Sequence, residues 1–543
     1  MKKIKNLRKI RPEIWLILIL IFALIIRLYF FIGLVNADPQ DDGIYIFYIK
    51  DVVEGKHDIK YFSQLANEET VNPVNTFKVR NGFLFPEAFF VKLLGYNQIG
   101  FTFYPLICSL LTIVLAYFFG KNIFMNANIG LLSSLLISFY PLDVTFSTKI
   151  SPDIPLACFI SLSIYFTILS FISKRKTKTS SLLAGVFASI AYTIKTFGII
   201  LFPVIISIIF YYYFKKNERK KLKLFILYFI VGFLPIFLIN EAYFYLNTGH
   251  VLLEPTINRK AQMDNFRGSS TTHVLTENFR VLTTFGEPIE FLKLAFGLKE
   301  SKLGVNYFGY FYFVLFFSLS LLLIKKKFNK SAPVLIWLAV GIAILEFSPV
   351  GIELKHDETL QVNYLLIPKE GRFMTMLTLP TVIIVSLALF NIQKSKTRKL
   401  IVFLVIVFLF TTSIFSINKI HDYFKDGIRD VETASRLIPF LDKPIYMDHL
   451  ARGEIRYFTG FKYDEKIKDF SGIVNETQLK DSYILVGGAR GVDIYWKVAV
   501  DIVPDFIKDT VIKGNDKWKL IEEIKGVETG YRNYSLRIYY VPL

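Results

Sequence analysis

The chain has 543 residues, of which 53% are hydrophobic, and its mean hydropathy is +0.43. This composition lies outside the range of ordinary soluble domains and excludes a water-soluble globular enzyme. The formal net charge of +19 at pH 7 would suit a nucleic-acid-binding protein only if the basic residues gathered on one surface. The two cysteines, Cys108 and Cys158, provide no disulfide framework.

The apolar residues fall in runs of about 20, the length that a helix needs to cross about 30 Å of hydrocarbon. These runs predict about eleven transmembrane helices, near 14–35, 98–119, 129–147, 154–172, 180–197, 199–214, 222–246, 306–324, 331–350, 373–392 and 399–417. The pair 180–197 and 199–214 also reads as one hairpin, and 129–147 is short. The first run is too long for the core of a signal peptide, so we expect it to remain as an anchor.

The basic residues are concentrated at the N-terminus and in alternate loops. They lie within residues 2–13, at 121, and within 174–178, 215–223, 325–330 and 394–399. These segments hold 25 of the 64 basic residues against Glu13 and Glu218, which leaves 39 basic and 43 acidic residues elsewhere. By the positive-inside rule the N-terminus is expected in the cytoplasm of a multi-pass protein of the cytoplasmic membrane. The charge therefore requires no nucleic-acid partner.

This topology places three long segments outside the membrane, on its outer face. We expect residues 1–418 to form a transmembrane domain with outer loops 36–97 and 247–305, and residues 419–543 to form a small extracytoplasmic domain. Within the first loop, 41–55 and 82–95 predict short interfacial helices. The tail predicts an α/β domain, with strands at 444–447, 483–486, 518–521 and 536–541 and helices at 450–459 and 504–512.

Seven charged residues lie in or beside the apolar runs. They are Arg27, Asp143, Lys149, Asp153, Lys195, Glu241 and Glu346. With the predicted topology, each falls in or near the outer half of its helix, while the cytoplasmic halves are free of charge. Snorkelling and end-capping explain any single one of them. Seven on one side instead favour a polar cavity that opens toward the outer leaflet.

The first outer loop contains an acidic cluster of Asp38, Asp41 and Asp42 immediately before or within its first expected helix. Acidic residues in this position usually cap a helix. At the mouth of a membrane cavity, they could instead supply a carboxylate as a general base.

Further motifs occur at the expected outer ends of later spans. Lys78 precedes a Gly82-Phe83 pair, and Asp153 opens the fourth span after the bends at 140–141 and 151–152. Lys195 lies near the end of the fifth span. The tenth span follows a Glu370-Gly371-Arg372-Phe373 element, with Pro380 within it.

Together with the Asp-Asp-Gly-Ile-Tyr element at 41–45, these motifs give the chain a resemblance that covers most of residues 10–420. It resembles the GT-C membrane glycosyltransferases, in particular the protein O-mannosyltransferase and lipid A aminoarabinose transferase branch. The resemblance implies an all-α polytopic GT-C fold and a polyprenyl-phosphate-linked sugar as donor. An acceptor hydroxyl would attack with inversion, a carboxylate would take its proton, and the lipid phosphate would leave.

The resemblance also implies roles for particular residues. Cations must meet the leaving phosphate, and the candidates are Lys78, Arg80, Lys195 and Arg372. Contact with lipid headgroups is the alternative for the two arginines. Tyr45, Asp153 and Glu370 are further candidates for the cavity.

Asp41 is the expected general base, because it lies one turn from the outer end of the first span. Asp42 is the close competitor, since a one-residue shift of register exchanges their directions on the helix. Asp38 is the third candidate, since Pro39 indicates an extended lead-in.

The chain also departs from the family's pattern. Asp42 stands where Glu is usual, and Phe77 stands where some relatives carry an acidic residue, so no cofactor is certain and a divalent metal remains open. The Trp-Trp-Asp signature of oligosaccharyltransferases is absent, so transfer of a whole glycan to Asn is not expected. The acceptor is a protein, lipid or glycan of unknown identity. The alternative function is a transporter or flippase of a lipid-linked or anionic substrate, although transporters place their sites near the bilayer midplane.

Overall fold

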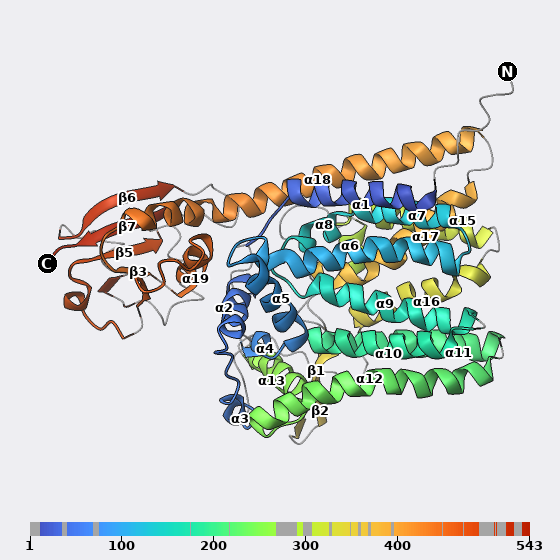
Figure 1. Ribbon diagram of the computed structural model, residues 1–543, viewed down its shortest axis with the longest axis horizontal. Coiled ribbons are helices and arrows are strands. Elements are labelled where there is room, and N and C mark those ends of the chain that lie inside the picture. The colour runs from blue at the N-terminus through green and yellow to red at the C-terminus, as the bar shows by residue number, and fades with distance from the viewer. Residues whose placement is uncertain are drawn as a thin grey trace. The chain divides into compact units, whose positions relative to one another are not determined.

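The structure is a computed structural model, and its helices and strands are drawn in Figure 1. It describes residues 11–34, 41–68, 75–173, 175–216, 218–267, 290–296, 307–324, 328–347, 349–356, 360–366, 371–392, 396–447, 449–470, 472–487, 504, 506–507, 517–525 and 535–543. The chain forms two compact units. The first comprises Met1–Phe31, Asp58–Pro86 and Tyr104–Lys419, and the second comprises Ile32–His57, Glu87–Phe103 and Ile420–Leu543.

The first unit is a bundle of apolar helices. They are α1 (Pro12–Tyr29), α6 (Phe103–Phe118), α7 (Ala127–Ser138), α8 (Pro141–Ser147), α9 (Asp153–Ile172), α10 (Thr177–Ile194), α11 (Leu201–Lys216), α12 (Arg219–Thr248), α15 (Phe311–Ile324), α16 (Phe328–Phe347), α17 (Thr378–Ile392) and the first part of α18 (Lys396–Leu437). Short helices α3 (Phe62–Leu65), α4 (Asn75–Lys78), α13 (Leu253–Arg267) and α14 (Glu290–Ala295) lie between them, as does an antiparallel pair of strands, β1 (Pro349–His356) and β2 (Leu360–Leu366).

Each of the eleven predicted spans corresponds to a helix or to a bent pair of helices. Among the described residues, seven helices are long and apolar enough to cross a membrane, and the pair α7 and α8, bent by 62°, makes up to eight. This confirms a mostly helical, multi-pass membrane protein. α15 and the apolar part of α16 are shorter than a full span. That these two helices and α10 span the membrane remains a prediction. The cytoplasmic location of the N-terminus also remains a prediction.

Helices α9, α10 and α12 lie side by side in that order (Figure 1). α10 and α12 approach so closely that a Cβ atom at Gly185 would lie 2.1 Å from the carbonyl oxygen of Phe229. A Cβ at Gly232 would lie 2.1 Å from the carbonyl oxygen of Leu182. Small residues permit this approach, which gives van der Waals contact where lipid offers no hydrophobic driving force.

A buried ion pair joins α1 to α8. Arg27 is fully buried, and its Nη2 lies 2.5 Å from Asp143 Oδ1. The guanidinium also donates to Ser109 Oγ on α6 at 2.9 Å and to the carbonyl oxygen of Ser138 at 3.0 Å. Arg27 and Asp143 thus pair with each other inside the bundle.

The second unit contains a five-stranded mixed sheet of order β4-β3-β5-β7-β6. The strands are β3 (Ile445–Met447), β4 (Ile467–Asp469), β5 (Ser482–Gly487), β6 (Lys519–Lys525) and β7 (Ser535–Val541), and helix α19 (His449–Phe458) follows β3. β3 runs parallel to β4 and β5, whereas β7 runs antiparallel to β5 and β6. The four predicted strands and the helix at 450–459 are confirmed. β4 was not predicted, and most of 504–512 lies outside the described residues.

Side chains on both faces of this sheet are buried. Leu485 of β5 packs with Ile455 of α19 and with Ile438, which directly follows α18, whereas Ile484 and Val486 pack in a second cluster that includes Trp518. Successive residues of a strand point to opposite faces, so β5 is covered on both sides. The second unit also contains α2 (Asp41–Val53) and the last part of α5 (Asn81–Leu94), the two short helices predicted in the first outer loop.

Removing one partner of the Arg27–Asp143 pair should lower the free energy of unfolding much more than replacing both partners with apolar residues. Arg27→Met alone leaves a buried carboxylate without its cation, and we expect it to lower the free energy of unfolding by about 3–5 kcal/mol. Arg27→Met combined with Asp143→Leu should recover most of that loss. Unfolding in detergent measures both.

The matched control is the exposed pair between Lys121 and Glu13, whose atoms are 2.9 Å apart and whose side chains are 42% and 54% exposed. Lys121→Met should cost about 1 kcal/mol or less. Equal losses for the two single variants would contradict the buried pair's structural role.

Candidate active site

Three predicted site residues lie at helix ends that meet at the same end of the bundle. Asp153 is the first residue of α9, and Lys195 follows the last residue of α10 directly. Arg372 belongs to the short 3-10 helix Gly371–Leu377, which leads into α17. Because α9 and α10 run antiparallel and pack together, the start of one helix lies beside the end of the other.

Lys195 and Asp153 form the centre of this group. Lys195 Nζ lies 3.1 Å from Asp153 Oδ1, and Ser151 Oγ donates to Asp153 Oδ2 at 2.8 Å. Arg372 lies within electrostatic range of both charges. The Phe373 ring is close to both cations, with its centroid 4.9 Å from Lys195 Nζ and 5.5 Å from the Arg372 guanidinium carbon.

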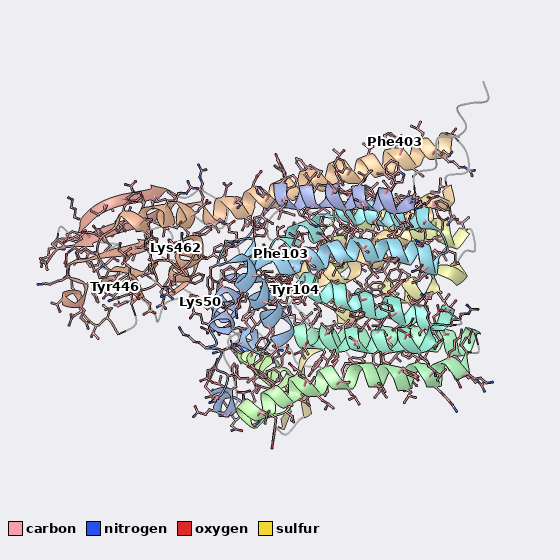
Figure 2. The ribbon with its side chains drawn as sticks, viewed as in Figure 1. Lys50, Phe103, Tyr104, Phe403, Tyr446 and Lys462 are labelled. Carbon is pink, nitrogen blue, oxygen red and sulfur yellow. The ribbon has the colours of Figure 1, made fainter. Side chains whose placement is uncertain are left out.

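Arg80 joins the group from the first outer loop. It is buried, lies within electrostatic range of Lys195, and places its guanidinium carbon 4.7 Å from the centroid of the Phe77 ring. Gly82 fixes the approach of this segment, because a Cβ there would lie 2.4 Å from Thr193 Oγ1 on α10. Tyr104, labelled in Figure 2, donates to the carbonyl oxygen of Gly82 at 3.4 Å.

The second outer loop contributes α13, which holds the break between α10 and α11. Glu254 Oε1 accepts the backbone N–H of Thr196 at 2.7 Å, and Asn258 Nδ2 donates to Thr196 Oγ1 at 2.8 Å. Leu253 and Ile257 of α13 are buried in an apolar cluster with Val79, next to Arg80. Arg80 and α13 therefore lie close to Lys195 and to the residue that follows it.

Among the acids of this group that lie outside the membrane spans, Glu254 is the one with a strongly shifted pKa. Burial raises its pKa to about 7, against the opposing effects of Arg80 and of the Thr196 hydrogen bonds. Glu241 of α12 and the phenol of Tyr192 also lie within electrostatic range of it. Glu241 Oε2 accepts the backbone N–H of Leu252 at 2.5 Å, so this acid holds the start of α13. Near neutral pH, Glu254 therefore alternates between a neutral and a charged form beside Arg80.

The arrangement gathers three cationic side chains around one ion-paired carboxylate. Asp153 pairs with Lys195, Arg372 lies within electrostatic range of both, and Glu254 lies within electrostatic range of Arg80. Burial strengthens the attraction of such cations for an anion, because the surroundings are less polarisable than water. The chemistry that this site supports is the binding and stabilisation of an anionic group.

The structure thus brings together Arg80, Lys195, Arg372 and Asp153 among the predicted site residues. Lys78 ends α4, and its Nζ lies 5.0 Å from the centroid of the Tyr61 ring. Tyr45 is buried in the second unit. Asp41 and Asp42 begin α2, also in the second unit, but their side chains lie outside the described ones, as does the whole of Glu370.

Sequence reasoning missed Glu254, Asn258 and Ser151. Glu254 and Asn258 lie in a loop expected to face water, where charged and amide residues are unremarkable, and only the fold shows that Glu254 is 1% exposed. The Ser151-Pro152-Asp153 motif did contain a signal, since a serine two residues before an aspartate at a helix start is a common local hydrogen-bond partner.

The donor set does not fit a divalent metal within the described part of the chain. There, no group of three or more His, Cys, Asp or Glu side chains is placed to share an ion. Phe77, which stands where some relatives carry an acidic residue, packs against Arg80. No step below is assigned to a metal.

Comparison with known proteins agrees with the resemblance seen in the sequence. Residues 83–242 match the family described as dolichyl-phosphate-mannose-protein mannosyltransferase. A protein of Aquifex aeolicus (strain VF5), described as uncharacterized, is 31% identical over 85 residues, which are 16% of this chain. The match spans only 17% of that relative's length.

Two solved structures share the fold. ArnT from Cupriavidus metallidurans bound to undecaprenyl phosphate is 11% identical, with 97% of each chain covered and a TM-score of 0.54. The oligosaccharyltransferase of Archaeoglobus fulgidus in the apo form is 11% identical, with 91% of this chain and 71% of that chain covered and a TM-score of 0.54.

The chain is mostly helical and multi-pass, with a small mixed sheet near the C-terminus, and its fold is similar to that of ArnT. The family match over 83–242 and this fold together confirm the predicted resemblance to the protein O-mannosyltransferase and ArnT branch.

The raised pKa of Glu254 predicts a stability that falls as the pH rises. Between about pH 4.5 and 7 the unfolded chain loses the Glu254 proton while the folded protein keeps it, so the free energy of unfolding decreases through this window. The full difference corresponds to roughly 3 kcal/mol.

Glu254→Gln keeps an oxygen for the Thr196 N–H and removes the titration. We expect its melting temperature in detergent to exceed that of the wild type above pH 7 and to approach it near pH 4.5. A constant difference between the two proteins at every pH would contradict the raised pKa.

Proposed function

We propose that the chain transfers a sugar from a polyprenyl-phosphate donor to an acceptor hydroxyl on the outer face of the membrane. The observation that carries this proposal is the group of buried Arg80 and partly buried Lys195 and Arg372 around buried Asp153, at one end of a membrane bundle. A lipid phosphate places an anion at such a position while its tail remains among the helices. The similar fold of ArnT, solved with undecaprenyl phosphate, supports this class of donor.

The reaction proposed for these residues is an inverting displacement. The acceptor oxygen forms a bond to the anomeric carbon, and the bond from that carbon to the phosphate oxygen breaks. The phosphate leaves with the electron pair, so negative charge develops on it. Lys195, Arg80 and Arg372 stabilise this charge, and the Lys195–Asp153 pair keeps the ammonium in place.

A carboxylate must take the proton of the acceptor hydroxyl. Asp41 is proposed as this general base and Asp42 as its competitor, on the strength of the 41–45 motif and of their position at the start of α2. Lys78 is proposed as a further donor-binding cation, with a weaker case because its contact is with Tyr61. Tyr45 and Glu370 remain proposed residues of the cavity.

The proposed topology keeps all eleven helical segments as spans, with the N-terminus in the cytoplasm. The acidic and aromatic loops then lie outside, where a lipid-linked donor and an acceptor meet. The transporter alternative receives no support from the comparisons, which match glycosyltransferases.

The function is tested by mass spectrometry of lipid-linked sugars and surface glycans from a deletion strain. The proposal expects a polyprenyl-phosphate sugar to accumulate and one sugar to disappear from a surface protein, lipid or glycan. Unchanged lipid-linked sugars and glycans would overturn it.

Donor binding should depend on the cations themselves. Arg372→Gln should weaken binding of undecaprenyl phosphate about 10- to 100-fold, because a hydrogen bond to a charged group is worth about 1.5–3 kcal/mol. Lys121 lies just after the last residue of α6, whereas Tyr104 of the candidate site lies near its first residue. Lys121→Gln should therefore leave binding unchanged. Native mass spectrometry of the protein with added undecaprenyl phosphate measures both.

A double variant separates a binding role of Lys195 from a structural one. Lys195→Gln combined with Asp153→Asn leaves no uncompensated buried charge, so the fold should survive while phosphate binding stays weak. Wild-type affinity in the double variant would show that Lys195 serves only to neutralise Asp153.

The general base is tested by Asp41→Asn. Asparagine caps a helix as well as aspartate does, so a capping role predicts a folded and active enzyme. The catalytic role predicts that turnover falls by about 10²–10⁴ while binding of undecaprenyl phosphate is retained. If Asp41→Asn is fully active and Asp42→Asn is not, the base is Asp42; normal turnover in both variants would refute the assignment.

A further inference from the structure

The second unit contains an unusual connection between α2 and the C-terminal part of the chain. Lys50, labelled in Figure 2, lies in the last turn of α2, and its Nζ is 2.6 Å from Asp464 Oδ2, which follows α19. The same ammonium lies 4.9 Å from the centroid of the Phe461 ring and 3.2 Å from Glu54 one turn further on. Lys50 and Asp464 are 17% and 25% exposed, so water screens this pair only in part.

Phe461, whose ring lies near the Lys50 ammonium, is held in a strained backbone conformation. Gly460 and Phe461 both have positive φ, +62° and +60°, which is unfavourable for a residue with a side chain such as Phe461. The Phe461 N–H closes the end of α19 by donating to the Arg456 carbonyl oxygen at 2.8 Å. Such backbone persists only where the surroundings fix it, and here the result is an aromatic ring presented to Lys50.

Aromatic packing completes the connection. Phe461 contacts Tyr96 and Phe101, with ring centroids 5.4 and 6.2 Å apart, and Phe101 contacts Tyr457 of α19 at 5.6 Å. Phe101 is fully buried and Tyr457 is 2% exposed. Asp464 is further fixed by Arg456, whose Nε lies 3.2 Å from Asp464 Oδ1.

α2 also depends on burial along its own length. Ile46 and Ile49 are fully buried and Tyr45 is 1% exposed. A helix of 13 residues is marginal by itself in water, so its position is set by what it packs against. In this unit α2 packs against α19.

We propose that the C-terminal part of the chain is a positioning element for α2, and that the Lys50–Asp464 contact and the Phe461 turn fix the direction in which Asp41 and Asp42 begin that helix. Lys50 and Asp464 are positioning residues in this role. The inference rests on the proposed function, because it assigns the base to the start of α2.

The test combines a structural readout with a kinetic one in the full-length protein. Asp464→Asn should raise amide hydrogen exchange in the last two turns of α2, while exchange of β5 stays unchanged. Turnover should fall roughly 10- to 100-fold, because small displacements of a catalytic group are costly, with affinity for undecaprenyl phosphate unchanged. The matched control is Lys443→Met, which breaks the 2.9 Å pair with Asp481 in the same unit and should leave turnover and α2 exchange unaltered.

A second variant guards against general misfolding. Lys50→Asp combined with Asp464→Lys restores an ion pair of opposite polarity and should recover part of the turnover and of the α2 protection. Faster α2 exchange with normal turnover would overturn the positioning role, and so would unchanged exchange in α2. If the wild type shows no transfer, the proposed function fails, whereas the exchange data still report whether Asp464 holds α2.

Discussion

The candidate site depends on one ion pair, between the lysine that ends α10 and the aspartate that begins α9. A charge at the end of a membrane helix must be paired or reach water, because leaving it alone in a low-dielectric environment is costly. Asp153 pairs with Lys195, and the Ser151 hydroxyl donates a hydrogen bond to the second carboxylate oxygen of Asp153. Arg80 and Arg372 add two further cations within electrostatic range of this pair. The proposed binding of a lipid phosphate rests on this gathering of three cations.

Helix α13 adds an acid to the same group. Glu254 lies buried on α13 and holds the start of the segment after Lys195 through the Thr196 N–H. A permanently ionised carboxylate here would compete with a substrate phosphate for Arg80. Burial favours the neutral form and raises the pKa to about 7, so Glu254 can accept the Thr196 hydrogen bond without fully cancelling the charge of Arg80. The structural and electrostatic roles of this acid are therefore compatible only because it is buried.

The sequence predicted the helices well, because the length of an apolar run that crosses the membrane follows from the bilayer itself. Four residues predicted for the site, Lys195, Asp153, Arg80 and Arg372, do lie together in the structure. The first two stood out as charges at the ends of apolar runs, and the two arginines came from the family resemblance. The sequence misjudged Arg27 and Asp143, which looked like members of a cavity and instead pair with each other. No local pattern distinguishes these two outcomes, because pairing depends on which helices become neighbours. Glu254 and β4 escaped for a similar reason: an acid in a polar loop and a three-residue strand become recognisable only through tertiary contacts.

Lys50 shows why the C-terminal part of the chain matters to a reaction proposed for the first outer loop. In sequence, Lys50 and Asp464 are 414 residues apart, and nothing in the 41–55 segment indicates that its helix needs a distant partner. A short amphipathic helix could have been held by the membrane interface alone, which would fix its depth but leave its rotation about the membrane normal free. An ion pair, the Phe461 ring near the ammonium and a buried apolar side fix the orientation of α2 against α19. A general base requires direction as well as depth, since it must lie within hydrogen-bond reach of a single hydroxyl. Attaching α2 to a folded sheet domain meets this requirement in a way that lipid contacts do not.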